Sequence, residues 1–421
     1  MKSLLILIVS IIVVSMCATL FIGCTEEQVR IEKDVIIVIP GLQGSVLYDA
    51  EHDVLGWAAE DLDDIAAMEK GFRYEAMNFT EDGEPANIYS ATLKPITFDT
   101  DIEKWKYGVN LENFARAAGS LLGLTPTVVK GLAQSIESAY ENTNQEVIVY
   151  QYDWRRSNVV EAEKLEKFIN DNGYTDVKFV VHSMGGILVS QYLARSAENI
   201  NKCSLLISLG TPYFGSIELT KYMETLKLPG SEVLTVEFGI NYPSAFELLP
   251  SAVFNSTSHF TEGQTSLIVD GAYKSYEDAM IYYSTNTSWG LKEDGTPKPM
   301  FNALTEFHNS MFTEDGKHIT SLVNTYYLQG SGRDTTVSIN YTDGKYDANG
   351  NKVQPLGDGI VPLYSGICGL SEDAENVIII MDDPTLPNNE GYVGHMGFPS
   401  QPRTIEAVLR ILATVEEPNK A

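Results

Sequence analysis

Ser183 is the residue whose neighbours best suit it to act as a nucleophile. Residues 178–187 (KFVVHSMGGI) contain a short β-branched run that stops at this serine, and two glycines follow it. A strand that turns at once into a helix lifts a serine hydroxyl out of a sheet and aims it at a cleft. Gly185 would let the backbones approach closely, and the amide of Met184 would point at a developing oxyanion. Val181 stands where a Gly-x-Ser-x-Gly motif has glycine, so this stretch alone predicts a simple turn as readily as a nucleophile.

A serine hydroxyl becomes reactive when a histidine takes its proton and a carboxylate orients that histidine. His395 is the candidate for this histidine, because it lies in a glycine-bounded turn after the last apolar run. The other histidines are less suitable. His182 lies beside the serine, and segments expected outside the sheet contain His52, His259, His308 and His318. Asp358 lies between two glycines, where a turn can direct a carboxylate inward; the alternative is a calcium-loop aspartate or a plain turn. Asp153 is instead expected to pair with an arginine, with Trp154 packing beside it.

Six apolar runs are expected to form the strands that position these residues: 35–39, 147–150, 178–181, 205–208, 325–329 and 377–380. Helical patterns alternate with them, which is typical of a mostly parallel sheet with helices on both faces. One helix would begin with Thr125 as N-cap and Pro126, and would bury one stripe of residues: Val129, Leu132, Ile136 and Ala139. A second would begin with a capping-box-like pair, Asn158 and Glu161, and end at Gly173.

The order serine, aspartate, histidine along the chain is that of the α/β-hydrolase fold. In that fold the loop after an early strand supplies a second oxyanion-hole amide. Leu42, directly after Gly41, is the candidate here, and Met184 supplies the first amide. Two segments interrupt the pattern: an irregular excursion at about 45–110 and a cap at about 216–324, which would cover the carboxyl ends of the strands. The alternative for the second segment is an independent domain. A polar loop is expected from residue 330 to Gly357.

Residues 1–23 have the features of a secretory leader, with Lys2 followed by an apolar run and a small residue, Gly23, at its end. Gly23-Cys24 resembles a bacterial lipobox, in which the cysteine is diacylated and becomes the mature N-terminus. The alternative is an uncleaved signal anchor, because the run is almost long enough to span a bilayer. Both interpretations place residues 24–421 outside the cytoplasm and attached to a membrane.

Composition narrows the possible partners. The 421 residues are 44% hydrophobic, which supports a large core, and the net charge of −28 disfavours nucleic acid or an anionic membrane surface as an electrostatic partner. The four cysteines form no metal-binding or disulfide spacing, so Cys203 and Cys368 are expected to be free thiols. We expect no metal and no cofactor.

Five motifs together resemble the lecithin:cholesterol acyltransferase family, which includes lysosomal phospholipase A2 and phospholipid:diacylglycerol acyltransferases. They are residues 39–41 (IPG), 152–155 (YDWR), 182–186 (HSMGG), 210–216 (GTPYFGS) and 357–362 (GDGIVP). The resemblance implies an α/β-hydrolase with a cap and a membrane-binding insertion. It also implies that residues after Gly41, including Trp57, help to hold lipid. The paired cysteines that tie the lid loop in animal members have no counterpart here.

The expected function is therefore that of a serine acyl hydrolase or acyltransferase. It would act on a phospholipid or glyceride at a membrane or micelle surface, through an acyl-serine formed by Ser183, His395 and Asp358. The same three residues would also serve a thioesterase or a small-ester carboxylesterase. A catalytically silent lipid-binding lipoprotein on the same scaffold is the alternative of another class, and the complete set of three residues argues against it.

Overall fold

The computed structural model describes residues 33–49, 51–52, 54–57, 74–96, 128–226, 238–255, 266–386 and 391–416. Contacts divide the chain into two units, residues 1–33 and 34–421. The leader and Cys24 lie outside the described residues, as do Thr125, Pro126 and His259. The account below concerns residues 34–421.

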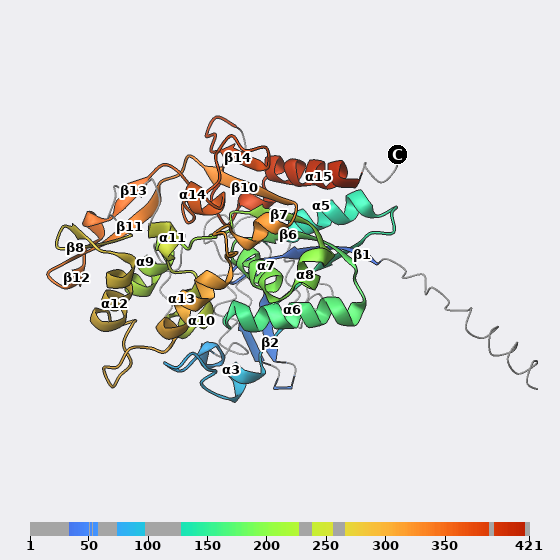
Figure 1. Cartoon of the computed structure of the whole chain (residues 1–421). Helices are drawn as coiled ribbons and strands as arrows, with labels where there is room; N and C mark the ends of the chain where they lie inside the picture. Colours follow the sequence, from blue (N-terminus) through green and yellow to red (C-terminus); the bar gives the residue numbers. More distant parts are fainter. Residues whose placement is uncertain are drawn as a thin grey trace, which may run out of the picture. The chain divides into compact units, whose positions relative to one another are not determined.

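A six-stranded parallel sheet organises this unit (Figure 1). Its order is β14-β10-β7-β6-β1-β5, and every neighbouring pair is parallel. The bounds are Asp34–Ile39 for β1, Glu146–Val149 for β5, Asp176–His182 for β6, Cys203–Leu209 for β7, Thr325–Ser331 for β10 and Val377–Met381 for β14. All six predicted strands are confirmed, with ends that differ by a residue or two.

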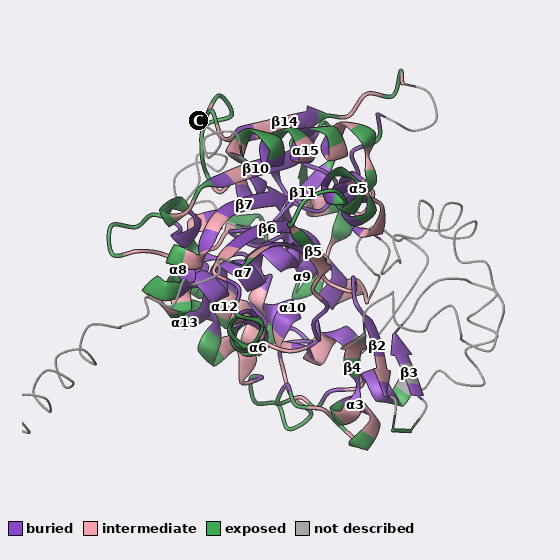
Figure 2. Ribbon diagram, turned by 90° about the vertical axis from the view of Figure 1, so that its right-hand side faces the viewer, coloured by how far each residue is buried: buried purple, intermediate pink, exposed green. Residues whose placement is uncertain are grey.

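Helices cover both faces of this sheet (Figure 1). On one face lie α5 (Lys130–Tyr140) and α15 (Pro402–Glu416), and on the other lie α6 (Asn158–Asn172), α7 (Met184–Arg195) and α8 (Ala197–Lys202). Successive strand side chains point to opposite faces, so Ile36 and Val38 pack with α5 and α15 while Ile37 and Ile39 pack with α6 and α7. The strands accordingly form the buried centre of the unit in Figure 2. The predicted α/β-hydrolase architecture is confirmed.

Two helix starts differ from prediction. Helix α6 is capped by Ser157, whose side chain accepts from the Val159 amide, and not by Asn158, which is already helical. Gly173 ends this helix with φ +71°, as predicted. Helix α5 begins at Lys130, after Val129, and its buried stripe runs through Leu132, Ala133, Ile136 and Tyr140. Ala139 is exposed, because the helical period places Tyr140, one residue later, on the buried face.

The segment predicted as an irregular excursion contains a three-stranded antiparallel sheet, in the order β3-β2-β4. Its described elements are β2 (Val46–Asp49), β3 (Val54–Trp57), the 3₁₀ helix η1 (Tyr74–Met77), α3 (Ile88–Thr92) and β4 (Lys94–Ile96). Their apolar side chains join the main core: Leu47, Trp57, Met77, Phe79 and Leu93 are all buried in it. The described residues of this segment therefore form a sheet of their own and also contribute to the main core.

The predicted cap contains α9 (Ile217–Thr225), η3 (Phe238–Asn241), α10 (Pro243–Glu247), α11 (Ala252–Asn255), β8 (Leu267–Val269), β9 (Ala272–Tyr273), α12 (Tyr276–Asn286), α13 (Met300–Ser310) and η4 (Ile319–Leu322). The expectation of a polar loop after β10 was wrong, because this segment forms regular structure. It forms β11 (Thr335–Thr342), β12 (Lys345–Tyr346), η5 (Ala348–Gly350) and β13 (Lys352–Gln354). Strand β11 pairs with β8 of the cap, so one sheet, in the order β12-β11-β8-β9, joins the two segments. The short α14 (Leu363–Gly366) and η7 (Phe398–Ser400) complete the described elements.

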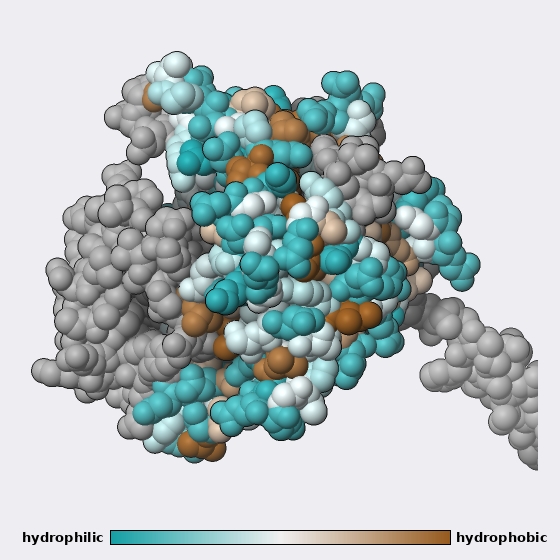
Figure 3. Space-filling model, turned by 90° about the vertical axis from the view of Figure 1, so that its left-hand side faces the viewer, coloured by the Kyte–Doolittle hydropathy of each residue, from teal (hydrophilic) through white to brown (hydrophobic). Residues whose placement is uncertain are grey.

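Cys203 in β7 and Cys368 are both free, as predicted, and Cys203 is the more deeply buried. Figure 3 shows the face that carries β8, β12 and α12, where apolar side chains gather in small separate groups among hydrophilic ones. Within the described ranges, no helix is both long enough and apolar enough to cross a bilayer.

Candidate active site

Ser183 occupies the turn between β6, which ends at His182, and α7, which begins at Met184. Its backbone has φ 53° and ψ −127°, a conformation that residues with a side chain rarely adopt. Two hydrogen bonds hold the turn: the Ser183 amide donates to the Leu209 carbonyl at 3.0 Å, and the Gly186 amide donates to the Ser183 carbonyl at 3.0 Å. The tight strand-to-helix turn predicted from the sequence is present.

Glycines allow the loop after β1 to lie directly against this turn. A Cβ on Gly185 would stand 2.7 Å from the Pro40 carbonyl oxygen, and a Cβ on Gly41 would stand 2.6 Å from Ser183 Cβ. Neither position has room for a side chain. Val181, which stands in place of the first glycine of a Gly-x-Ser-x-Gly motif, is fully buried in the sheet, where a β-branched side chain packs well.

The structure brings Ser183, His395 and Asp358 into one hydrogen-bonded chain. Ser183 Oγ lies 2.9 Å from His395 Nε2, and His395 Nδ1 lies 2.8 Å from Asp358 Oδ2. A carboxylate only accepts, so Nδ1 carries the imidazole proton and Nε2 is free to accept from the serine hydroxyl. All three residues are buried. They come from parts of the chain up to 212 residues apart.

The turn 357–362 fixes the carboxylate of Asp358. Its Oδ1 accepts from the amides of Ile360 and Val361 at 3.1 and 2.8 Å, which leaves Oδ2 for His395. The His395 amide also donates to the Asp358 carbonyl oxygen at 3.0 Å, so the two turns are joined through their backbones as well. Although the second sheet separates Asp358 from β10 in sequence, a Cβ on Gly330 of β10 would stand 3.1 Å from Asp358 Cβ.

His182 supports the histidine turn, a contact that the sequence analysis did not identify. Its Nε2 donates to the carbonyl oxygen of His395 at 3.1 Å, and the two rings lie 4.8 Å apart between centroids. Burial and the neighbouring His395 lower the pKa of His182 well below its ordinary value, so this ring stays neutral. The signal available in the sequence was a histidine directly before the serine, at the carboxyl end of the same strand.

Leu42 and Met184, the residues predicted to supply oxyanion-hole amides, both lie close to Ser183 in the chain or in space. Met184 is the first residue of α7, and the first amides of a helix have no partner within it. Leu42 directly follows Gly41, which contacts Ser183, and its half-buried side chain packs on the main core. These positions agree with the roles predicted for Leu42 and Met184, and the roles themselves remain predictions.

Trp57 is buried beside the loop that follows β1. It is 5% exposed, its Nε1 donates to the Gln43 carbonyl at 2.9 Å, and its ring packs edge-on against Trp154 at 5.3 Å. The side chain therefore helps to hold the loop that follows β1. Its assignment to lipid binding stays a prediction that this position does not favour.

A serine hydroxyl that donates to histidine, with a carboxylate behind the histidine, is suited to nucleophilic attack on an acyl carbonyl. In the part of the chain that the structure describes, no group of three or more His, Cys, Asp or Glu residues is arranged to hold a metal ion.

The parallel sheet and the serine turn at the end of β6 define an α/β-hydrolase. The sequence model of the family described as "Lecithin:cholesterol acyltransferase" matches residues 118–381, which is more than half of the chain. The chain belongs to the lecithin:cholesterol acyltransferase family. No curated protein matches it.

One of the similar solved structures, with a TM-score above 0.5, agrees with the fold. A chain of the Tle4–Tli4 complex is 14% identical over 91% of this chain and 98% of its own length, with a TM-score of 0.58. Phospholipase PlaB from Legionella pneumophila is 14% identical over 70% of this chain and 62% of its own, with a TM-score of 0.34. The product of the gene lin2722 from Listeria innocua is 12% identical over 90% and 94%, with a TM-score of 0.32.

Proposed function

We propose that this protein is a serine-dependent acyl hydrolase that acts on lipid esters, either phospholipids or glycerides. The observation that carries the proposal is the hydrogen-bonded chain Ser183–His395–Asp358 at a strained strand-to-helix turn. Membership of the lecithin:cholesterol acyltransferase family supports a lipid ester as substrate.

In the proposed mechanism Ser183 Oγ attacks the acyl carbonyl carbon while its proton passes to His395 Nε2. The carbonyl electron pair moves onto oxygen, and the amides of Leu42 and Met184 donate to the resulting oxyanion. Collapse of this intermediate expels the alcohol, which takes the proton from His395, and leaves an acyl-serine. Asp358 holds the imidazole tautomer and stabilises its positive charge throughout.

Water is the acceptor that we propose for the second half of the reaction. An alcohol would compete only if a pocket excluded water and oriented that alcohol. We further propose that the rate rises when the substrate is aggregated. This part rests on the family rather than on the surface in Figure 3, where apolar side chains lie in small groups.

Fluorophosphonate labelling with product analysis tests the proposal. The wild type should react with the probe and release free fatty acid from phospholipid or glyceride vesicles, faster than from the same ester as monomer. Ser183→Ala should abolish both signals and keep the fold. Ser190→Ala is the matched control, since Ser190 is buried on the same helix and its Oγ donates to the Gly186 carbonyl. Labelling that persists in Ser183→Ala would place the nucleophile elsewhere.

The products also separate the related activities. Acyl product found chiefly on an added alcohol would make the protein a transferase. Smooth saturation on monomeric short-chain esters, with no gain on vesicles, would favour a soluble esterase.

We also propose an extracytoplasmic location, with the chain anchored through a diacylglyceryl group on Cys24. The basis is the leader and the Gly23-Cys24 junction in the sequence. Mass spectrometry of the mature protein should find a lipid-modified cysteine at its N-terminus. Peptides from before Cys24 in the mature chain would support an uncleaved anchor instead.

A further inference from the structure

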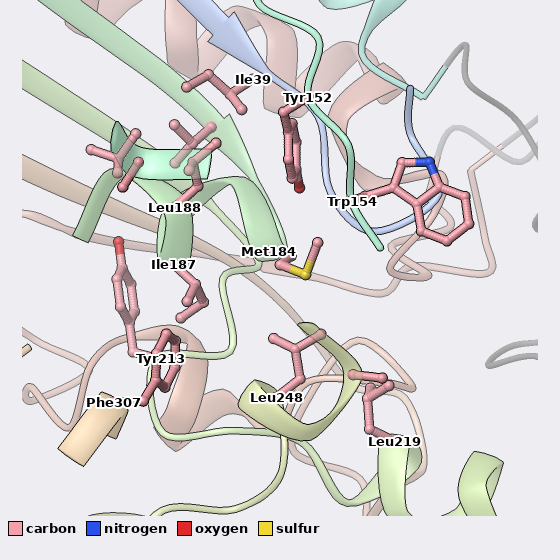
Figure 4. Close-up of a cluster of buried hydrophobic side chains, with 14 of the residues drawn as sticks. Ile39, Tyr152, Trp154, Met184, Ile187, Leu188, Tyr213, Leu219, Leu248 and Phe307 are labelled. Atoms are coloured by element: carbon pink, nitrogen blue, oxygen red, sulfur yellow. The ribbon is translucent and has the colours of Figure 1, made fainter. Parts of the chain in front are cut away.

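Tyr152 lies just beyond the carboxyl end of β5, and its ring is directed toward the serine turn. Its amide donates to Ser45 Oγ at 3.2 Å, which ties it to the loop that also carries Gly41 and Leu42. In Figure 4 its hydroxyl points toward Met184, and both residues belong to the same buried cluster.

The hydroxyl of Tyr152 is buried and has no hydrogen-bond partner among the described residues. The residue is 1% exposed. An unpaired buried hydroxyl destabilises the folded state, and phenylalanine would fill the same space without that cost. Burial raises the pKa of this phenol well above its ordinary value, and the charge of Glu161 adds to the effect. The group therefore keeps its proton and can donate.

We propose that Tyr152 Oη, beside the amides of Leu42 and Met184, is a third hydrogen-bond donor to the oxyanion that forms on the acyl oxygen when Ser183 attacks the ester. This inference rests on the proposed function, because the acyl oxygen exists at the site only if an ester binds there. Tyr152 would then be a catalytic residue: its hydroxyl has no partner in the free enzyme and gains one in the transition state. A donor that is unpaired before reaction strengthens the transition state relative to the ground state.

The chemistry balances without a proton leaving the phenol. The bond from Ser183 Oγ to the acyl carbon forms as the carbonyl π bond breaks, and the serine proton goes to His395 Nε2. The negative charge on the former carbonyl oxygen is met by three donated hydrogen bonds. When the intermediate collapses, the π bond re-forms and Tyr152 Oη is released with its own hydrogen.

The test is Tyr152→Phe, which removes one oxygen atom from a packed side chain. Tyr192→Phe is the matched control: Tyr192 is fully buried on α7, its hydroxyl also has no partner among the described residues, and its ring packs on Phe179 at 5.6 Å. The probe substrate is a p-nitrophenyl ester of a medium-chain acid, and the second probe is the matching alkyl trifluoromethyl ketone. That ketone forms a hemiketal with the serine and so presents an oxyanion.

In Tyr152→Phe we expect kcat to fall on the order of 10²-fold with KM within about twofold of wild type. Affinity for the trifluoromethyl ketone should fall by a similar factor. The melting temperature should stay equal or rise, because the unpaired hydroxyl is gone. Tyr192→Phe should keep wild-type kcat and ketone affinity. If the hydroxyl were only structural, its removal would lower the melting temperature and leave both kcat and KM unchanged.

Unchanged kcat in Tyr152→Phe, a rise in KM alone, or a clear fall in melting temperature would each overturn the proposal. A wild-type protein that hydrolyses no ester and binds no ketone would instead overturn the proposed function, and the inference would fall with it. The wild-type measurement therefore distinguishes the two failures.

Discussion

Asp358 and Asp153 are both buried carboxylates in turns near the ends of strands, and their partners differ completely. Asp358 faces one imidazole and two backbone amides. Asp153 faces two arginines: Arg155 donates from Nε and Nη2 at 2.8 Å each, and Arg156 donates from Nε at 3.2 Å. One carboxylate oxygen of Asp358 therefore remains to orient the histidine. In Asp153, by contrast, both carboxylate oxygens accept from arginine side chains.

The arginine partner makes Asp153 a structural residue. Burial alone would raise the pKa of Asp153, but the charge of Arg155 and its hydrogen bonds outweigh burial, so the pKa lies below its usual value. Arg155 also donates to the carbonyls of Ala76 and Ser90 at 3.0 and 3.1 Å, and its guanidinium lies 5.1 Å from the centre of the Phe79 ring. The pair therefore ties η1 and α3 to the turn after β5. The predicted pairing of Asp153 and packing of Trp154 are confirmed.

Substituting each aspartate by asparagine gives the largest contrast between the two regions. Asp358→Asn should fold normally but lose about 10⁴-fold in kcat, because the amide would favour the wrong histidine tautomer. The measurements are ester hydrolysis at saturating substrate and thermal unfolding of the same preparation.

Asp153→Asn should show the opposite pattern. It leaves the charge of Arg155 buried without its partner, which costs about 3–5 kcal/mol of unfolding free energy. The folded fraction should retain most of its kcat, as measured against active-site titration. If Asp153→Asn remains folded and loses more kcat than Asp358→Asn, the two roles are reversed.

The same contrast explains which parts of the fold the sequence predicted. Strand β1 is almost continuously apolar, and such a run identifies a strand buried on both faces. Strand β11 has seven buried residues of eight, yet its sequence is TTVSINYT. Two of its polar side chains find partners outside the strand: Thr336 donates to the Glu218 carboxylate, and Asn340 donates to Asp347. Hydrophobic pattern alone cannot show those partners.

Local geometry explains why the candidate site was predictable. Ser183, Asp358 and His395 lie in short glycine-bounded turns whose order along the chain follows from the fold. The burial of Trp57 could not be read from the sequence, because it depends on Trp154, almost a hundred residues later. The hydroxyl of Tyr152 was beyond prediction for the same reason, since its lack of a partner is a property of the assembled core.

Glu247, at the end of α10, is a third carboxylate, and the donors that it meets on Ser157 and Asn158 are uncharged. Its oxygens accept from Ser157 Oγ at 2.5 Å and from the Asn158 amide and Nδ2 at 2.8 Å each. These bonds join the cap to the first turn of α6. Burial raises the pKa of Glu247 to about 7, despite the hydrogen bonds from Ser157 and Asn158 that lower it.

Because the pKa of Glu247 is raised on folding, the folded state binds more protons than the unfolded state between the unfolded value of 4.5 and about 7. The stability that comes from this group is fully present below pH 4.5 and is lost as pH rises through about 7. Glu247→Gln keeps a neutral side chain at every pH. Relative to wild type, the variant should therefore gain roughly 1–3 kcal/mol of unfolding free energy between pH 5 and pH 7.5.

Urea unfolding of both proteins at the two pH values measures this gain. The control is Glu163→Gln, an exposed residue of α6, the helix that Glu247 contacts, and it should show no gain. The change expected for Glu247→Gln is smaller than the change expected for either aspartate variant. Glu247 is surrounded by neutral donors and can take up a proton, whereas Arg155 cannot lose one. A variant that loses more stability at pH 7.5 than at pH 5 would mean that the ionised carboxylate is the form the junction favours. In that case the hydrogen bonds from Ser157 and Asn158 outweigh burial, and Glu247 resembles Asp153 after all.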